Sequence, residues 1–152
     1  MSPRFPSPVI DQMLVRGQIT RVAPNRAQSD QLLTQGEAHL RSAKMLRDTD
    51  TAGALVLAYD GARKALTAIL LHQGLKPRGE EAHALLAEAV GSQMASALDL
   101  TGFAWMRTTR NATEYGSDRH PGATAADVDE AVQLATTIHQ RAQVVLDHMY
   151  PY

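Results

Sequence analysis

The sequence predicts an all-α fold, an antiparallel bundle of four to six helices joined by short loops. Apolar residues recur with a period near 3.6 over several long stretches, and no stretch shows the sustained alternation of a β-strand. The segments between these stretches carry the Gly, Pro and Asn residues that are typical of turns. The chain has 152 residues, which suits one domain.

The first 24 residues are expected to form a lead-in with one short helix, and residues 25–150 the helical bundle. The start, "MSPRFPSP", contains three prolines and predicts an irregular segment. The stretch "VIDQMLVRG" predicts a short helix closed by Gly17, and "QITRVAPN" a connector. Asn25 follows a proline and is expected to cap the next helix.

Two long helices are expected over residues 26–47 and 51–73. The first has a single apolar face. The second carries leucines outside its main apolar stripe, which predicts that it is central in the bundle or buried by a partner chain. These leucines are Leu57, Leu70 and Leu71. Gly74 is expected to end this helix.

Three further helices are expected after the loop "LKPRGEE". "EAHALLAEAV" predicts a short helix that ends near Gly91, and residues 94–115 a helix with a bend at Gly102. "GSDRHPG" breaks the chain, and "TAAD" resembles a capping box for the last helix.

Composition excludes several classes of protein. The formal net charge is -1, which argues against bulk electrostatic coating of nucleic acid but permits a local basic cleft. There is no cysteine, so disulfides and thiolate metal sites are excluded and a reducing compartment is expected. No apolar run reaches the roughly 18 residues of a membrane span, and the first residues lack the apolar core of a signal peptide. We therefore expect a cytoplasmic protein that does not bind membranes.

The densest polar cluster is "RTTRNATEYG", residues 107–116. At about 100° per helical residue, its five larger polar side chains share an arc of roughly 140°. The opposite side, with Leu98, Trp105 and Ala112, is expected to face the core. The five side chains are Arg107, Arg110, Asn111, Glu114 and Tyr115.

The residue types of this cluster can recognise anions, donate hydrogen bonds and stack on rings. Arginine pairs two oxygens of a phosphate, and tyrosine can stack on a base. The alternative is a solvated helix face in which Arg110 and Glu114 form an i, i+4 pair, which typically contributes only about 0.3–0.5 kcal/mol.

Other candidate sites have little support. The six histidines show no metal-ligand spacing, so neither a metal nor a cofactor is expected. His39 and His139 lie on apolar stripes and are expected to be hydrogen-bonded core residues. Asp60 and Lys64 are spaced for a surface ion pair. Sequence motifs of nucleotide-binding loops and of hydrolases are absent.

Three stretches together resemble the HEPN-domain superfamily. "LLTQGEAHLRSAKML" and "AGALVLAYDGARKALTAILLHQGLKP" resemble its first two long helices. "RTTRNATEYG" resembles its active-site segment, an arginine with a polar neighbour and then a histidine four to six residues on. The lead-in "IDQMLVRGQITRVAPN" resembles an actinobacterial branch of the superfamily.

The resemblance implies a helical bundle that forms a homodimer, with two arginine segments in one cleft. It also implies a metal-independent RNase, often a toxin encoded beside a nucleotidyltransferase-type antitoxin. By position, Arg110 matches the motif arginine and Asn111 its polar neighbour, so catalytic roles are implied for these two and for Tyr115. Arg107 and Glu114 are expected to bind substrate.

The sequence departs from the motif because Tyr115 stands where the histidine is expected. His120 lies beyond the helix-breaking loop and cannot replace it by spacing. Histidine titrates near neutral pH, whereas tyrosine has a pKa near 10 and needs neighbouring positive charge to act as a base. Three hypotheses therefore stay open: an endoribonuclease, a non-catalytic HEPN module that binds RNA or a partner protein, and a structural helical dimer.

Overall fold

The computed structural model describes residues 6–79, 82–94, 98–115 and 122–152. These residues form six helices and one two-stranded antiparallel sheet, so the predicted all-α bundle is confirmed. Within these ranges no helix combines the length and hydropathy needed to cross a bilayer. The elements are α1 (Pro8–Val15), β1 (Ile19–Arg21), α2 (Arg26–Leu46), α3 (Thr51–His72), β2 (Leu75–Pro77), α4 (Ala82–Met94), α5 (Thr101–Tyr115) and α6 (Ala125–Asp147).

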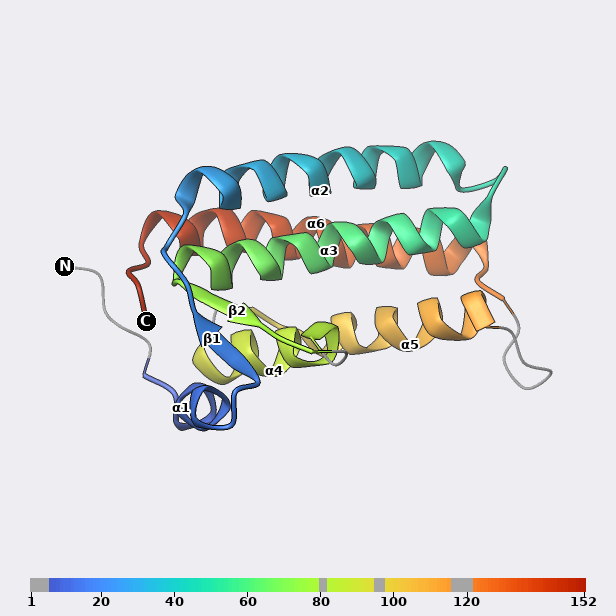
Figure 1. Cartoon of the computed structure of the whole chain (residues 1–152). Coiled ribbons are helices and arrows are strands. Elements are labelled where there is room, and N and C mark those ends of the chain that lie inside the picture. Colours follow the sequence, from blue (N-terminus) through green and yellow to red (C-terminus); the bar gives the residue numbers. More distant parts are fainter. Residues whose placement is uncertain (1–5, 80–81, 95–97, 116–121) are drawn as a thin grey trace.

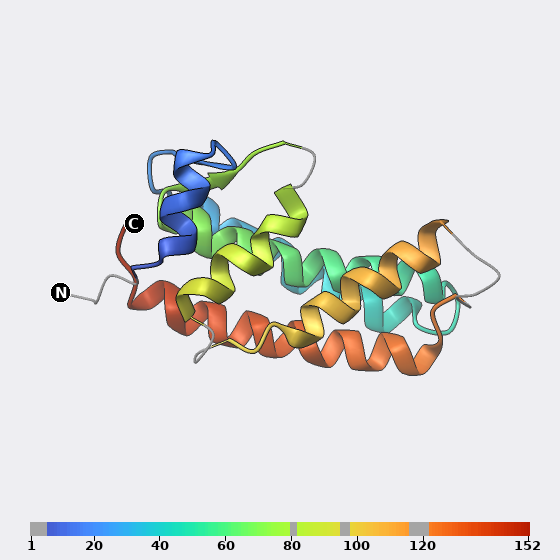
Figure 2. The ribbon, with the colours of Figure 1, turned by 90° about the horizontal axis from the view of Figure 1, so that it is seen from below.

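Three long helices, α2, α3 and α6, lie side by side and form the main layer of the molecule (Figure 1). Helices α4 and α5 lie on the other side of α3 from α2, and α1 and the two strands pack at one end. Seen from below, α4 and α5 both cross α3 obliquely, one after the other along its length (Figure 2). The face of α3 between them is where the candidate site forms.

Helix α3 is the centre of the bundle. It contacts α2, α4, α5, α6 and β2, and most of its small and aliphatic residues are buried. Leu70 is fully buried inside the chain, while Leu57 and Leu71 are half-buried. The apolar side chains outside the main stripe are therefore covered mainly by other helices of the same chain, which confirms the central position.

Helices α2 and α3 approach closely at Gly36 and Gly61. A Cβ atom on Gly36 would lie 2.5 Å from Cε1 of His139 and 3.0 Å from the Gly61 carbonyl oxygen. The His139 ring from α6 fills this space, and its Nε2 lies 2.7 Å from the Gly61 oxygen. His139 is therefore a buried, hydrogen-bonded core histidine as predicted, whereas His39 is only half-buried.

The two short strands differ from the prediction of a connector and a loop. Residues 19–21 pair with residues 75–77 in antiparallel register, Ile19 opposite Pro77 and Arg21 opposite Leu75. Ile19 and Leu75 are each only 1% exposed. Strands of three residues are too short to show a recognisable alternation, and tertiary packing decides their conformation.

The helix expected over residues 94–115 is present but begins later than predicted. Helix α4 continues past Gly91 to Met94, and α5 begins at Thr101. The Asp99 carboxylate accepts a hydrogen bond from the Thr101 backbone nitrogen at 3.0 Å, which satisfies a free donor at the start of α5. Gly102 lies in the first turn of α5 rather than at a bend.

Four other predicted helix boundaries are confirmed. Gly17 and Gly74 have φ values of 72° and 77°, the left-handed conformation that follows a helix C-terminus. The Asn25 side chain accepts from the Gln28 backbone nitrogen at the start of α2. Thr124 and Asp127 form the complete capping box of α6.

The lead-in packs onto the bundle through the C-terminal residue. The Tyr152 hydroxyl donates to the Asp11 carboxylate at 2.7 Å and accepts from the Ser7 backbone nitrogen at 3.1 Å. Ile10 and Met13 of α1 are buried in the common core. The division into a lead-in of residues 1–24 and a bundle of residues 25–150 stays a prediction.

Candidate functional site

The side of α5 that faces the core is not the predicted one. Phe103 and Met106 are its buried residues, whereas Trp105 and Ala112 are only half-buried. The Phe103 ring stacks on Tyr59 of α3, with ring centroids 5.3 Å apart. The prediction took the side with the apolar Trp105 and Ala112 as the core side. It was wrong because helical periodicity alone does not show which neighbouring helix α5 packs against.

Arg110 extends this buried side of α5. At about 100° per residue, Phe103, Met106 and Arg110 fall within roughly 60° of one another. The Arg110 guanidinium therefore lies over α3, with its Cζ 5.8 Å from the centroid of the Tyr59 ring. The side chain is 25% exposed.

Two neighbours on α5 hold the Arg110 guanidinium from the other side. Its Nη1 lies 2.7 Å from the Glu114 carboxylate and donates to the Asn111 side-chain oxygen at 3.3 Å. Its Nε is buried and has no hydrogen-bond acceptor among the described residues. Arg110 is thus a fixed cation at the edge of the core, and the predicted i, i+4 pair with Glu114 is present.

The other predicted site residues differ in placement. Arg107 and Glu114 are exposed, and Asn111 is half-buried. Tyr115 is the last residue of α5, and its side chain lies outside the described part of the structure. His120 also lies outside the described residues.

Sequence reasoning missed the contribution of α3. Asp60 was expected to pair with Lys64, but it pairs with Arg63 at 3.5 Å, while Lys64 donates to Gln35 of α2 at 3.1 Å. Spacing along a helix permits both pairs, and the position of α2 decides between them. Arg63 lines a pocket with residues of α4, and its buried Nε is the atom that pairs with the Asp60 carboxylate.

The Tyr59 ring lies beneath the Arg110 guanidinium. It is 2% exposed, and burial raises the pKa of its hydroxyl. Arg107, Arg63 and Arg110 oppose this pKa shift, so all three guanidinium groups act on the same ring. Arg63, Arg107 and Arg110 are called the cationic surface below. The aromatic residue in "LAYDGARKA" was the available signal, but sequence alone could not bring α5 onto it.

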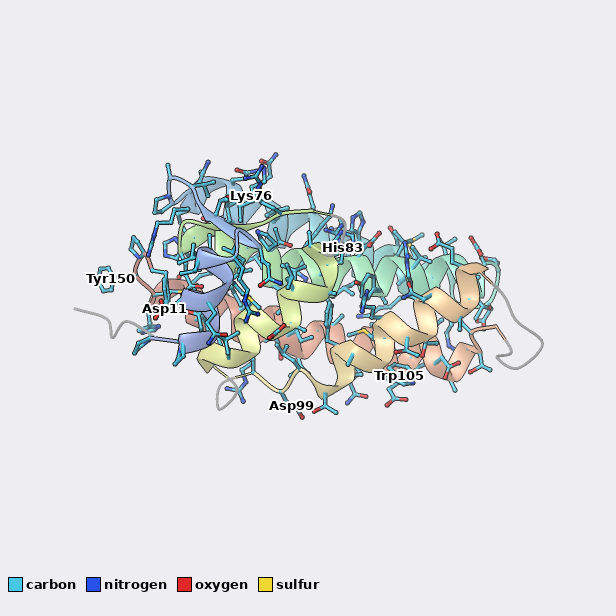
Figure 3. The ribbon with its side chains drawn as sticks, turned by 60° about the horizontal axis from the view of Figure 1, so that its bottom comes forward. Asp11, Lys76, His83, Asp99, Trp105 and Tyr150 are labelled. Atoms are coloured by element: carbon cyan, nitrogen blue, oxygen red, sulfur yellow. The ribbon has the colours of Figure 1, made fainter. Side chains whose placement is uncertain are left out.

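His83 belongs to the same neighbourhood. It lies in the first turn of α4, on the side of α5 away from Trp105 (Figure 3). Partial burial lowers the pKa of its imidazole, and the nearby Arg63, Arg110 and Arg107 lower it further, while Asp60 raises it. The sequence analysis placed His83 in no site, because only the fold brings α4 beside α3 and α5.

The arrangement can bind an anion. The Arg110 guanidinium lies over the buried Tyr59 ring, and Arg63 and Arg107 also lower the pKa of the Tyr59 hydroxyl. Among the described residues near them, Asp60 and Glu114 carry negative charge. Among the described residues, no group of three or more His, Asp or Glu side chains could hold a metal ion. Phosphate is the anion that the fork of a guanidinium matches best.

Comparison with known proteins gives one match. A family model described as "HEPN domain" matches residues 29–145, a range that begins in α2 and ends in α6. The match therefore includes α3, α4 and α5, the three helices that form the cationic surface and carry His83. Neither the curated proteins nor the solved structures gave a match.

Proposed function

Because the chain belongs to the HEPN-domain family, we propose that it is an RNase-like protein that binds RNA on its cationic surface and cleaves it there without a metal ion. The observation that carries this proposal is the placement of Arg110. Glu114, Asn111 and Tyr59 fix its guanidinium, and Arg107 lies one turn before it on the exposed side. A fixed guanidinium stabilises charge that develops on a phosphate in the transition state without reorganising.

The chemistry of such cleavage needs a base and an acid. The 2′-oxygen attacks the adjacent phosphorus and loses its proton to the base, and the bond from phosphorus to the 5′-oxygen breaks as the acid protonates that oxygen. Arg110 binds the non-bridging oxygens, and Asn111 orients the phosphate. Tyr115, at the motif position of the histidine, is the group assigned to proton transfer, and Arg107 supplies positive charge beside it. Glu114 holds Arg110 in place at the edge of the substrate site.

The proposal includes a homodimer in which two copies of the α5 segment share one cleft. The leucines of α3 do not support a dimer, because Leu70 is buried and Leu57 and Leu71 are half-buried within one chain. The support is the family relationship and the polar face of α5. Light scattering at tens of micromolar tests it: twice the chain mass is expected, and the mass of one chain would contradict the shared cleft.

We assign the protein to a toxin–antitoxin or defence system in the cytoplasm, with a nucleotidyltransferase-type protein as antitoxin. The support is the family relationship alone. Co-expression tests this role: growth arrest by the protein alone, relieved by the neighbouring gene product, is expected. An absence of growth arrest at high expression would contradict it.

The second candidate is a non-catalytic module that binds RNA or a partner protein at the same surface. The specific observation is that Tyr115 takes the place of the motif histidine. Incubation of purified protein with labelled RNA in EDTA separates the two candidates. Cleavage that Arg110→Ala abolishes supports the enzyme, whereas binding without cleavage supports the module.

A further inference from the structure

A pocket of about 190 Å³ lies where α3, β2 and α4 meet. Three basic side chains from three different elements line it: Arg63 of α3, Lys76 of β2 and His83 of α4. Thr67 and three apolar residues, Pro77, Ala82 and Leu86, complete the lining. Figure 3 shows Lys76 and His83 on the same side of the molecule.

This pocket adjoins the cationic surface. Arg63 belongs to both, since it lines the pocket and also acts on the Tyr59 ring that Arg110 covers. Arg63 follows Tyr59 by one helical turn on α3, so the pocket continues the surface along that helix. An RNA strand carries a phosphate at every nucleotide, so a strand bound at Arg110 and continuing along α3 would bring a further phosphate to the pocket.

We propose that this pocket is a second phosphate subsite, in which protonated His83 binds a phosphate group of the RNA together with Arg63 and Lys76. The inference rests on the proposed RNA binding, but it concerns residues outside the motif segment. The apolar lining, with Leu86 and Pro77, gives the neighbouring ribose or base a surface to contact.

The charges around His83 make this binding depend on pH. Arg63 and Asp60 face it from α3, Lys76 from β2, and Arg107 and Arg110 from α5. Partial burial and the three arginines lower the pKa of free His83, so it is neutral near pH 7. A bound phosphate offsets the positive charge and raises the pKa again, so binding takes up a proton. Affinity is therefore expected to rise as the pH falls from 7.5 to 5.5.

The direct test follows the His83 imidazole signal by NMR, assigned by its loss in His83→Gln. The pKa of His83 is measured in free protein, with inorganic phosphate at matched ionic strength, and with a ten-nucleotide uridylate. We expect the RNA oligonucleotide to raise the pKa. An unchanged pKa in the presence of bound RNA would overturn the subsite.

A matched pair of charge variants gives a second readout. Lys76→Gln is expected to weaken binding of the same oligonucleotide three- to tenfold and to reduce the slope of log affinity against log salt by about 0.7, the contribution of one phosphate contact. Lys44→Gln removes the same charge from an exposed position on α2, on the far side of α3, and is expected to change neither quantity. Equal effects of the two variants would overturn the subsite.

Failure of the subsite and failure of the proposed function give different results. If RNA binds and Arg107→Gln weakens it, but neither the His83 signal nor Lys76→Gln responds, only the subsite is overturned. If RNA does not bind, the proposed function fails. The His83 pKa measured with inorganic phosphate then shows whether the pocket binds phosphate at all. A His83 pKa that phosphate raises supports a phosphate site for a different ligand, and an unchanged pKa overturns it. A large loss of turnover in His83→Gln with unchanged affinity would also overturn phosphate binding and assign His83 to proton transfer.

Discussion

The guanidinium of Arg110 lies over the ring of Tyr59, with its Cζ 5.8 Å from the ring centroid. The contact joins the predicted phosphate-binding residue of α5 to the central helix α3. Arg110 therefore belongs both to the candidate site and to the packing of α5, and Tyr59 supports it from beneath. The effects of replacing Arg110 follow from this double role.

Arg110→Ala is expected to weaken RNA binding and also to lower stability by about 1–2 kcal/mol. It removes a cation–π contact, worth roughly 0.5–2 kcal/mol, and a partly exposed ion pair. An Arg110 side chain that pointed away from the core, as the sequence predicts, would leave the stability of this variant unchanged. Arg107→Ala, at an exposed position, should weaken binding with a stability change within about 0.5 kcal/mol. Thermal melts of both variants check this, and equal melting temperatures would contradict it.

The core side of α5 shows where sequence reasoning reached its limit. The polar arc of "RTTRNATEYG" and the Arg110–Glu114 pair could be predicted, because both depend only on helical geometry. The contact with Tyr59 and the position of His83 could not, since they depend on how α4 and α5 cross α3. The bundle and its caps could be predicted because local sequence signals are strong in long helices. The two strands could not, because such signals are weak in a strand of three residues.

Substitutions of Tyr115 separate proton transfer from stacking. If Tyr115 transfers a proton, Tyr115→Phe should reduce cleavage by the roughly 10²–10⁴-fold typical of general acid–base catalysis, with RNA affinity little changed. If it only stacks on a base, the Phe variant should be nearly silent and Tyr115→Ala should lose about 1–3 kcal/mol of binding. Tyr115→His restores the family's residue and should raise activity. Unchanged cleavage and binding by the Phe and Ala variants would remove Tyr115 from the site.

Alanine substitutions of Gly36 in α2 and Gly91 in α4 are expected to change the stability in opposite directions. Gly36→Ala places a Cβ 2.5 Å from the His139 ring, which must move, so we expect a net loss of stability despite the better helix former. A Cβ on Gly91 would meet only Leu100, at 3.7 Å, among the described residues, so Gly91→Ala should gain up to about 1 kcal/mol from helix propensity. Urea denaturation measures both. A stabilised Gly36→Ala would show that α2 and α3 do not approach as described.

The buried His139 is expected to make the folded protein less stable in mild acid. Burial lowers the pKa of this imidazole in the folded state, while hydrogen bonding to Gly61 and the charge of Glu37 oppose the shift. Because the unfolded chain binds the proton first, the stabilisation is complete above about pH 6.5 and is lost as the pH falls through the lowered pKa. Each unit of pKa difference corresponds to about 1.4 kcal/mol.

The variant His139→Gln keeps an amide donor for the Gly61 oxygen but cannot titrate. Its stability should change less between pH 7.5 and pH 5 than that of the unmodified protein. The remaining slope is expected to come from His39 and His83, whose pKa values burial also lowers. Denaturation midpoints at the two pH values measure the difference, and identical slopes would show that folding does not change the pKa of His139.

The central claim is that RNA is bound and cut at the cationic surface over α3 and α5. The most direct measurement is the binding and cleavage of one labelled RNA in EDTA by the unmodified protein, by Arg107→Gln and by Arg41→Gln. Both substitutions remove one exposed arginine charge, but Arg41 lies on α2, on the far side of α3. We predict that Arg107→Gln loses at least tenfold in affinity or cleavage while Arg41→Gln matches the unmodified protein. Equal behaviour of the two variants, or no binding by any of the three proteins, would contradict the account.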